Sequence, residues 1–97
     1  MIHRFARFEV KKEHLPAALT AIKAFVDEVG RKEGGTATYK SFQDTEHPTR
    51  FLHYMVFRVA SAEDYHKKTA WHKRFLETLG PLCTEPYQVA PATLVAG

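Results

Sequence analysis

The side chains best suited to chemistry in this sequence are its six histidines, because an imidazole can take up or release a proton near neutral pH. They are His3, His14, His47, His53, His66 and His72. No two of them lie four residues apart, so no helix presents the histidine pair that many zinc sites use. The sequence also contains no CxxC pair, no HExxH motif and no glycine-rich phosphate loop. We therefore expect no metal site, and any catalysis must come from side chains that the fold brings together.

His72 is the best candidate for a catalytic residue. It falls on the apolar stripe of an expected helix together with Tyr65 and Phe75, which predicts that its ring points into the protein. In a dry pocket such a histidine can accept or donate a proton, whereas as a plain core residue it would bond a backbone carbonyl. Trp71 flanks the stripe, where packing or an interface is the more common role. His66 lies off the stripe and is predicted to face solvent.

Hydrophobic periodicity predicts four strands and two helices that would position these residues. The strands are residues 2–10, 36–42, 50–59 and 86–95. The first helix carries an apolar stripe from Leu15 to Val29, with Pro16 in its first turn, and Gly34-Gly35 ends it. The second begins at a Ser61 cap and stops at Gly80-Pro81. The order β-α-β-β-α-β indicates a ferredoxin-like α+β fold with an antiparallel four-stranded sheet.

Two strands carry further information. Pro91 within the last strand favours an edge or a bulge, because proline cannot donate to the ladder. The strand 51–59 is apolar on both sides: Phe51, His53, Met55, Phe57 and Val59 alternate with Leu52, Tyr54 and Val56. Two helices can cover only one face of the sheet, so we expect a second copy of the chain on the other face, giving a homodimer. A strand that is hydrophobic by propensity alone is the alternative.

Length and composition limit the remaining possibilities. A chain of 97 residues has room for one domain, residues 1–97. The formal charge of +3 is mild, and the basic run from His66 to Arg74 is typical of a solvated helix face, so no nucleic-acid partner is expected. A lone cysteine, Cys83, fits a reducing cytoplasm. No apolar run reaches membrane-spanning length and the first residues do not resemble a signal peptide, so neither a membrane nor an export route is expected.

Several short motifs resemble antibiotic biosynthesis monooxygenase (ABM) domains, and the likeness spans nearly the whole chain. They are Glu33-Gly34-Gly35, Tyr39, Phe42-Gln43-Asp44, Arg50-Phe51-Leu52-His53-Tyr54 and Thr69-Ala70-Trp71-His72-Lys73-Arg74-Phe75. The resemblance implies a dimeric α+β barrel with a pocket in each subunit. It also implies, for some members, a monooxygenase that needs no cofactor and acts on quinols or polyketide phenols. Where members often carry Glu-x-Trp, this chain has Met55-Val56-Phe57, and haem degradation is not favoured because the chain has no asparagine.

The resemblance suggests a small aromatic ligand and a set of contacts for it. His72 would accept the hydroxyl proton of a phenol or quinol, and a cation, Arg7 or Arg58, would stabilise the anion before an electron passes to O₂. Both arginines could equally be surface ion-pair partners. The residues expected to bind substrate are Tyr54, Tyr65, Arg7, Arg58, Phe57, Trp71 and Phe75.

Two other function classes share this fold. A ligand-binding or stress-related barrel dimer without turnover is one, and the missing Glu-x-Trp slightly favours it. An RNA-recognition domain is the other, but residues 51–59 lack the glycines and the leading basic pattern of its third strand.

Overall fold

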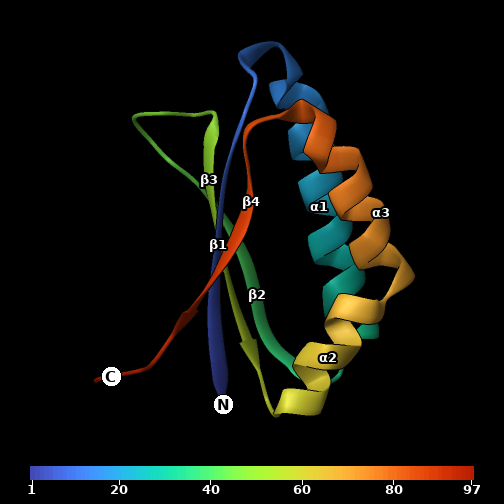
Figure 1. Cartoon of the computed structure of the whole chain (residues 1–97), viewed down its shortest axis with the longest axis vertical. Helices are drawn as coiled ribbons and strands as arrows, with labels where there is room; N and C mark the ends of the chain where they lie inside the picture. The colour runs from blue at the N-terminus through green and yellow to red at the C-terminus, as the bar shows by residue number, and fades with distance from the viewer.

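The computed structural model describes residues 1–97 as an antiparallel sheet with all its helices on one face (Figure 1). The strands are β1 (Ile2–Val10), β2 (Thr36–Gln43), β3 (Arg50–Phe57) and β4 (Cys83–Ala92), in the spatial order β2-β3-β1-β4. The helices are α1 (Leu15–Lys32), α2 (Ala60–Lys68) and α3 (Ala70–Leu79), with 3₁₀ turns at Lys12–His14 and Gly80–Leu82. The predicted ferredoxin-like α+β fold is confirmed. None of these helices combines the length and the apolar character needed to cross a membrane.

The long helix α1 forms where the sequence predicts it. Its buried residues recur at three- and four-residue steps, so one stripe faces the sheet. They are Ala18, Ile22, Phe25 and Val29. Proline stands in the first turn, and Arg31 and Lys32 in the last turn suit the negative end of the helix dipole. This stripe packs on aromatic residues of the sheet and of α3, which include Phe8, Phe51 and Phe75, and forms the main core.

The expectation of one continuous second helix is wrong. The helix begins at Ala60 rather than after a Ser61 cap, and the extended residue Thr69 divides it into α2 and α3. The Thr69 hydroxyl accepts the backbone N–H of His72 at 3.1 Å and thereby caps α3. Because one extended residue separates the two helices, a side chain on α2 no longer keeps the phase that a continuous helix would give it.

Strands β3 and β4 differ from expectation only at their ends. β3 stops at Phe57, so Val59 leaves the strand and lies exposed beside the start of α2. β4 begins at Cys83 and ends at Ala92, three residues earlier at both ends than predicted. It is an edge strand with register shifts against β1, which confirms what Pro91 indicated.

The register of β1 and β3 assigns each residue to a face of the sheet. Ala6 pairs with His53 and Phe8 pairs with Phe51. These residues are buried, and their side chains lie on the face that the helices cover, which we call the inner face. The intervening residues belong to the opposite, outer face, which no element of this chain covers (Figure 1).

Candidate functional site

A buried carboxylate, Glu33, organises the polar part of the interior. It follows α1, and its side chain is 1% exposed. It accepts hydrogen bonds from the Trp71 indole nitrogen at 2.6 Å, from the Thr36 hydroxyl at 2.8 Å and from His66 Nδ1 at 2.7 Å. Burial alone would raise the pKa of this carboxyl group, but the hydrogen bonds from His66, Trp71 and Thr36 outweigh it and hold the pKa below its ordinary value. Glu33 is therefore ionised, and three side-chain donors stabilise its negative charge.

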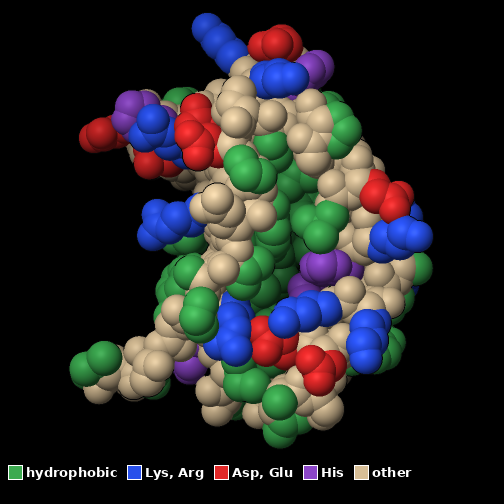
Figure 2. All heavy atoms as spheres, viewed as in Figure 1, with side chains coloured by type: hydrophobic (Ala, Val, Ile, Leu, Met, Phe, Trp, Pro, Cys, Tyr) green, Lys and Arg blue, Asp and Glu red, His purple; other side chains and the backbone are tan.

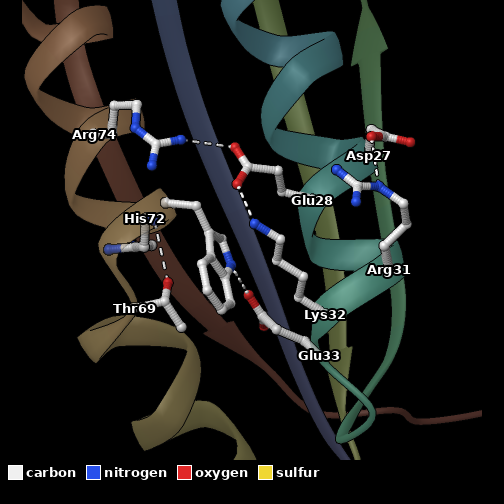
Figure 3. A network of polar contacts seen from close by, with 9 residues as sticks. Asp27, Glu28, Arg31, Lys32, Glu33, Thr69, His72 and Arg74 are labelled. Carbon is white, nitrogen blue, oxygen red and sulfur yellow. Dashed lines mark hydrogen bonds and ion pairs between the residues drawn. The ribbon is translucent and has the colours of Figure 1, made fainter.

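The donor Trp71 also contacts a cation at the end of α1. The Lys32 ammonium lies over its ring at 5.0 Å from the centroid, an arrangement typical of cation–π contacts. Lys32 also bonds the Glu28 carboxylate at 2.9 Å, and Arg74 of α3 reaches the same carboxylate at 2.9 Å (Figure 3). These contacts tie the end of α1 to α3 and fix the position of the indole above Glu33.

Two histidines from different helices meet beside Glu33. The rings of His66 and His72 lie 4.9 Å apart, and both pack near the Phe25 ring. The prediction that His66 faces solvent is wrong: it is 3% exposed, because the break at Thr69 turns α2 so that His66 points at Glu33. His72 is half-buried, and burial, together with the neighbouring His66, lowers the pKa of His72. His72 is therefore neutral at neutral pH and able to accept a proton.

A second polar group lies on the inner face of the sheet. The Tyr39 hydroxyl is 2.8 Å from His53 Nδ1 and 3.2 Å from the Tyr87 hydroxyl. His53 is fully buried, its Nε2 has no hydrogen-bond partner, and burial lowers its pKa to about 3. Burial likewise raises the pKa of Tyr87 to about 12 and that of Tyr39 well above 10. All three groups are neutral across the physiological range.

These two groups face each other across one interior, since the Tyr39 ring lies 5.7 Å from the His66 ring. We call them the interior cluster. Its members are Glu33, Tyr39, His53, His66, Trp71, His72 and Tyr87. Figure 2 shows the molecule hollowed between the sheet and α3, with hydrophobic side chains within the hollow and histidine at its helical side. The arrangement offers aromatic surface, two neutral histidines (His53 and His72) and one fixed negative charge. No group of three or more His, Cys, Asp or Glu side chains is placed to hold a metal ion.

Comparison with known proteins assigns the family. The sequence matches the family described as antibiotic biosynthesis monooxygenase over residues 1–78. The chain belongs to this family. It has no match among curated proteins.

Solved structures of similar fold agree with the ABM assignment. One, from Nitrosomonas europaea and provisionally described as an antibiotic biosynthesis monooxygenase, has a TM-score of 0.91 and 22% identity, covering 99% of this chain and 100% of that one. Another, described as an antibiotic biosynthesis monooxygenase, has a TM-score of 0.91 and 21% identity, covering 99% and 100%. A conserved protein of Methanosarcina mazei Go1 has a TM-score of 0.86 and 20% identity, covering 94% and 89%. At these identities the likeness shows a shared fold.

The fold of this ABM protein brings four of the predicted site residues to the helical side of the sheet. Phe57 lies on the inner face, 5.1 Å from the His66 ring between centroids, and Phe75 stacks on Phe25 in the core. Trp71 and His72 belong to the interior cluster. These residues come from β3 and α3 and surround one region.

The other four predicted residues lie outside the interior. Arg58 is exposed and its Nε donates to the carbonyl of Gly34. Tyr65 is an exposed residue of α2, and its ring meets the Trp71 ring edge-on at 6.4 Å between centroids. Arg7 and Tyr54 lie on the outer face, where each lines an open hollow, of about 560 Å³ for Arg7 and about 510 Å³ for Tyr54. Neither hollow contains the histidine pair, and neither unites the eight predicted residues.

Sequence reasoning missed the centre of the interior cluster. The ABM-like motifs contain Glu33, Tyr39 and His53, but the resemblance gave them no role. His53 lies on the same face of β3 as the apolar residues Phe51 and Met55. This position was the one sign in the sequence that His53 is buried. The contact of His66 with Glu33 depends on the break between α2 and α3. Nothing in the sequence indicates this break, because the helical pattern of apolar residues continues across it.

Proposed function

We propose that this chain is a cofactor-independent monooxygenase that oxidises a small aromatic quinol or phenol, with residues 1–97 forming one ABM domain. One observation carries the proposal beyond family membership: a neutral histidine, His72, lies beside a second histidine and an ionised carboxylate in an aromatic interior. A proton acceptor next to a fixed negative charge, surrounded by rings, suits deprotonation of an aromatic hydroxyl group.

The proton transfer assigns a role to each member of the histidine pair. His72 makes no side-chain hydrogen bond, so a ring nitrogen is free to accept the hydroxyl proton. The imidazolium that forms is stabilised by the Glu33 carboxylate, which is held beside His66. His66 and Trp71 keep that carboxylate in place through their hydrogen bonds.

The oxidation that follows needs only O₂ as the oxidant. The phenolate gives one electron to O₂, and the resulting radical pair combines to form a C–O bond at a hydrogen-bearing ring carbon ortho to the hydroxyl. The O–O bond then breaks as the ring C–H proton leaves, so one oxygen atom becomes a quinone carbonyl and the other departs as water. Phe57, Phe75 and Trp71 are proposed to contact the ring. A dry aromatic site favours this chemistry because it strengthens the electrostatic help that fixed groups give.

Arg7 and Tyr54 are proposed to take part in dimer contacts. Both lie on the uncovered outer face, together with Phe5, Phe42 and Leu52. We propose that this face packs against a second copy of the chain, because an apolar sheet face of this kind is rarely left in water. Arg58 and Tyr65 then remain surface residues of each subunit.

Oxygen uptake with a panel of quinols and phenols tests the function. We expect uptake by the wild type, and a loss of about 100-fold or more in His72→Gln, because a missing general base costs that much. His47→Gln is the matched control, since His47 is an exposed residue of the loop between β2 and β3. Full turnover by His72→Gln would remove His72 from the mechanism, and no uptake with any panel member would contradict the function itself.

A further inference from the structure

Three charged side chains meet at one end of the interior. Arg4 of β1 and Glu63 of α2 form a two-point ion pair, with Nε to Oε2 at 2.8 Å and a second guanidinium nitrogen to Oε1 at 3.2 Å. The Lys67 ammonium lies 3.8 Å from the same carboxylate. Two cations therefore share one anion. Figure 2 shows basic and acidic side chains side by side at the lower end of the hollow, below the histidines.

This cluster spans the gap between the sheet and α2. Arg4 pairs with Met55 across the strands and alternates with Ala6, so its side chain emerges on the inner face. Glu63 is nearly buried, with its side chain 11% exposed, whereas that of Lys67 is 58% exposed. The ion pair thus joins the first strand to the helix that carries His66 and closes this end of the interior.

The other cation near the interior cluster, Lys32 over the Trp71 ring, already bonds Glu28. The buried charged or titratable side chains are Glu33, His53, Glu63 and His66, and no lysine or arginine is buried. The donors around Glu33 are already engaged with its carboxylate. An anionic substituent on an aromatic ligand could therefore be neutralised only at the rim, by Arg4 and Lys67.

We propose that Arg4 and Lys67 select aromatic substrates that carry a carboxylate, and that this carboxylate replaces Glu63 on the Arg4 guanidinium. The inference rests on the proposed function only for the location of the site, and it adds the substrate class. A planar guanidinium that already holds one carboxylate at two points has the geometry to hold another. Displacing Glu63 also releases the contact that closes the interior at this end.

The spacing along the sheet suits a single ring. Arg4 and Ala6 are two residues apart on β1, which places them about 7 Å from each other. Ala6 faces His53 across the strands, and His53 belongs to the interior cluster. A benzoate whose carboxylate lies on Arg4 would therefore direct its ring, and a hydroxyl at the opposite carbon, toward the cluster.

A matched pair of probes tests this selection without turnover. We would titrate the protein with 4-hydroxybenzoate and with 4-hydroxybenzamide, which share a shape and differ in charge, and measure both dissociation constants by calorimetry. We expect the wild type to bind the acid about tenfold more tightly, as a charge-assisted hydrogen bond predicts. Arg4→Met should bind the two alike. Arg50→Met is the control, because it removes the same charge from an exposed Arg–Glu pair at the other end of the sheet, and it should keep the preference.

A second variant covers the case in which Arg4→Met does not fold. Glu63→Gln removes the competing charge from the cluster and leaves Arg4 in place, so it should bind the acid more tightly than the wild type does. The single indole N–H signal of the chain, that of Trp71, reports in NMR spectra whether either probe reaches the interior cluster. Equal affinities in the wild type, a preference that survives Arg4→Met, weaker acid binding by Glu63→Gln, or no binding of either probe would each overturn the proposal.

The outcome is separable from that of the proposed function. A charge preference without oxygen uptake would keep the binding site and contradict the monooxygenase. Oxygen uptake with neutral quinols, without a preference for the acid, would support the monooxygenase and contradict the carboxylate site.

Discussion

The two faces of strand β3 carry similar residues and have different surroundings. On the inner face Phe51, His53, Met55 and Phe57 are at most 5% exposed, since α1, α2 and α3 cover them. On the outer face Val56 is buried as well, but Leu52 and Tyr54 are half-buried and line an open hollow of about 510 Å³. Each face also has a histidine–tyrosine contact of 2.8 Å, His53 with Tyr39 inside and His3 with Tyr54 outside.

The difference shows that burial, and not residue type, gives the inner face its chemical character. Inside, His53 is kept neutral by desolvation and the Glu33 carboxylate keeps its charge only because donors surround it. Groups held in this way cannot relax toward water, which is what a site for proton transfer requires. The contact of His3 with Tyr54 lies in an open hollow, so how far these two groups are desolvated depends on what covers the outer face.

Removing the centre of the interior cluster should have the largest effect. Glu33→Ala leaves the donors of Trp71, His66 and Thr36 without their acceptor in a buried place, which should lower the free energy of unfolding by about 3–5 kcal/mol. Urea denaturation followed by circular dichroism measures the loss. Glu28→Ala, which cuts the surface network between α1 and α3 one turn away, should cost much less. Similar losses in both variants would mean that burial does not distinguish the two carboxylates.

The pH dependence of stability should separate burial from hydrogen bonding at His53. Between pH 6.5 and 4.5 an unfolded histidine takes up a proton, whereas His53, with its pKa near 3, stays neutral in the folded state. The unfolded state therefore binds more protons, and stability falls as the pH falls, by about 2–3 kcal/mol across this window. His53→Phe should remove this part of the decline.

Tyr39→Phe is the control for that measurement. It deletes the hydrogen bond to His53 but leaves the histidine buried, and burial is the cause of the shift. Its unfolding free energy, measured at both pH values, should be lower throughout and decline with pH as in the wild type. A decline that disappears in Tyr39→Phe would assign the effect to the hydrogen bond.

The fold was predictable from the sequence because its main elements have regular periods. The stripe of α1 and the limits of β1 follow directly from residue spacing, and Pro91 indicated the edge strand. The division at Thr69 was not predictable in the same way, since residues on both sides continue a helical pattern. One extended residue there decides where His66 points.

The site was predictable only in part, for a related reason. His72 and Phe75 were placed on one inward face because periodicity marks the face that a residue occupies, while Trp71 and Phe57 were proposed from the family resemblance. Contacts between distant segments, such as Glu33 with His66 across 33 residues, depend on how elements pack, and spacing does not encode that. The same limit explains why Arg7 and Arg58 were chosen as cations, while the rim of the interior holds others.

The position of α2 against the sheet should be sensitive to one added methyl group. A Cβ added to Gly35 would lie 2.5 Å from the Ala62 Cβ, closer than atoms can approach, so Gly35→Ala must shift α2. We expect a loss of about 1–3 kcal/mol in the free energy of unfolding. Gly34→Ala is the matched control, because nothing lies within 4 Å of its added Cβ. Equal stabilities for the two variants would show that α2 adjusts freely, and the inner face would then be less rigid than its contacts indicate.

A charge on the outer face should have the smallest effect on folding and the clearest effect on assembly. Leu52 is half-exposed in the single subunit, so Leu52→Glu should change the free energy of unfolding of one subunit by less than about 1 kcal/mol. In a two-fold dimer the same substitution places two like charges in an apolar contact, which should convert dimers into monomers in sedimentation experiments. Ala17→Glu, at an exposed position of α1, should leave the dimer intact. A wild type that sediments as a monomer at high concentration would leave the outer face wet, and the two faces of β3 would then differ in burial without differing in partner.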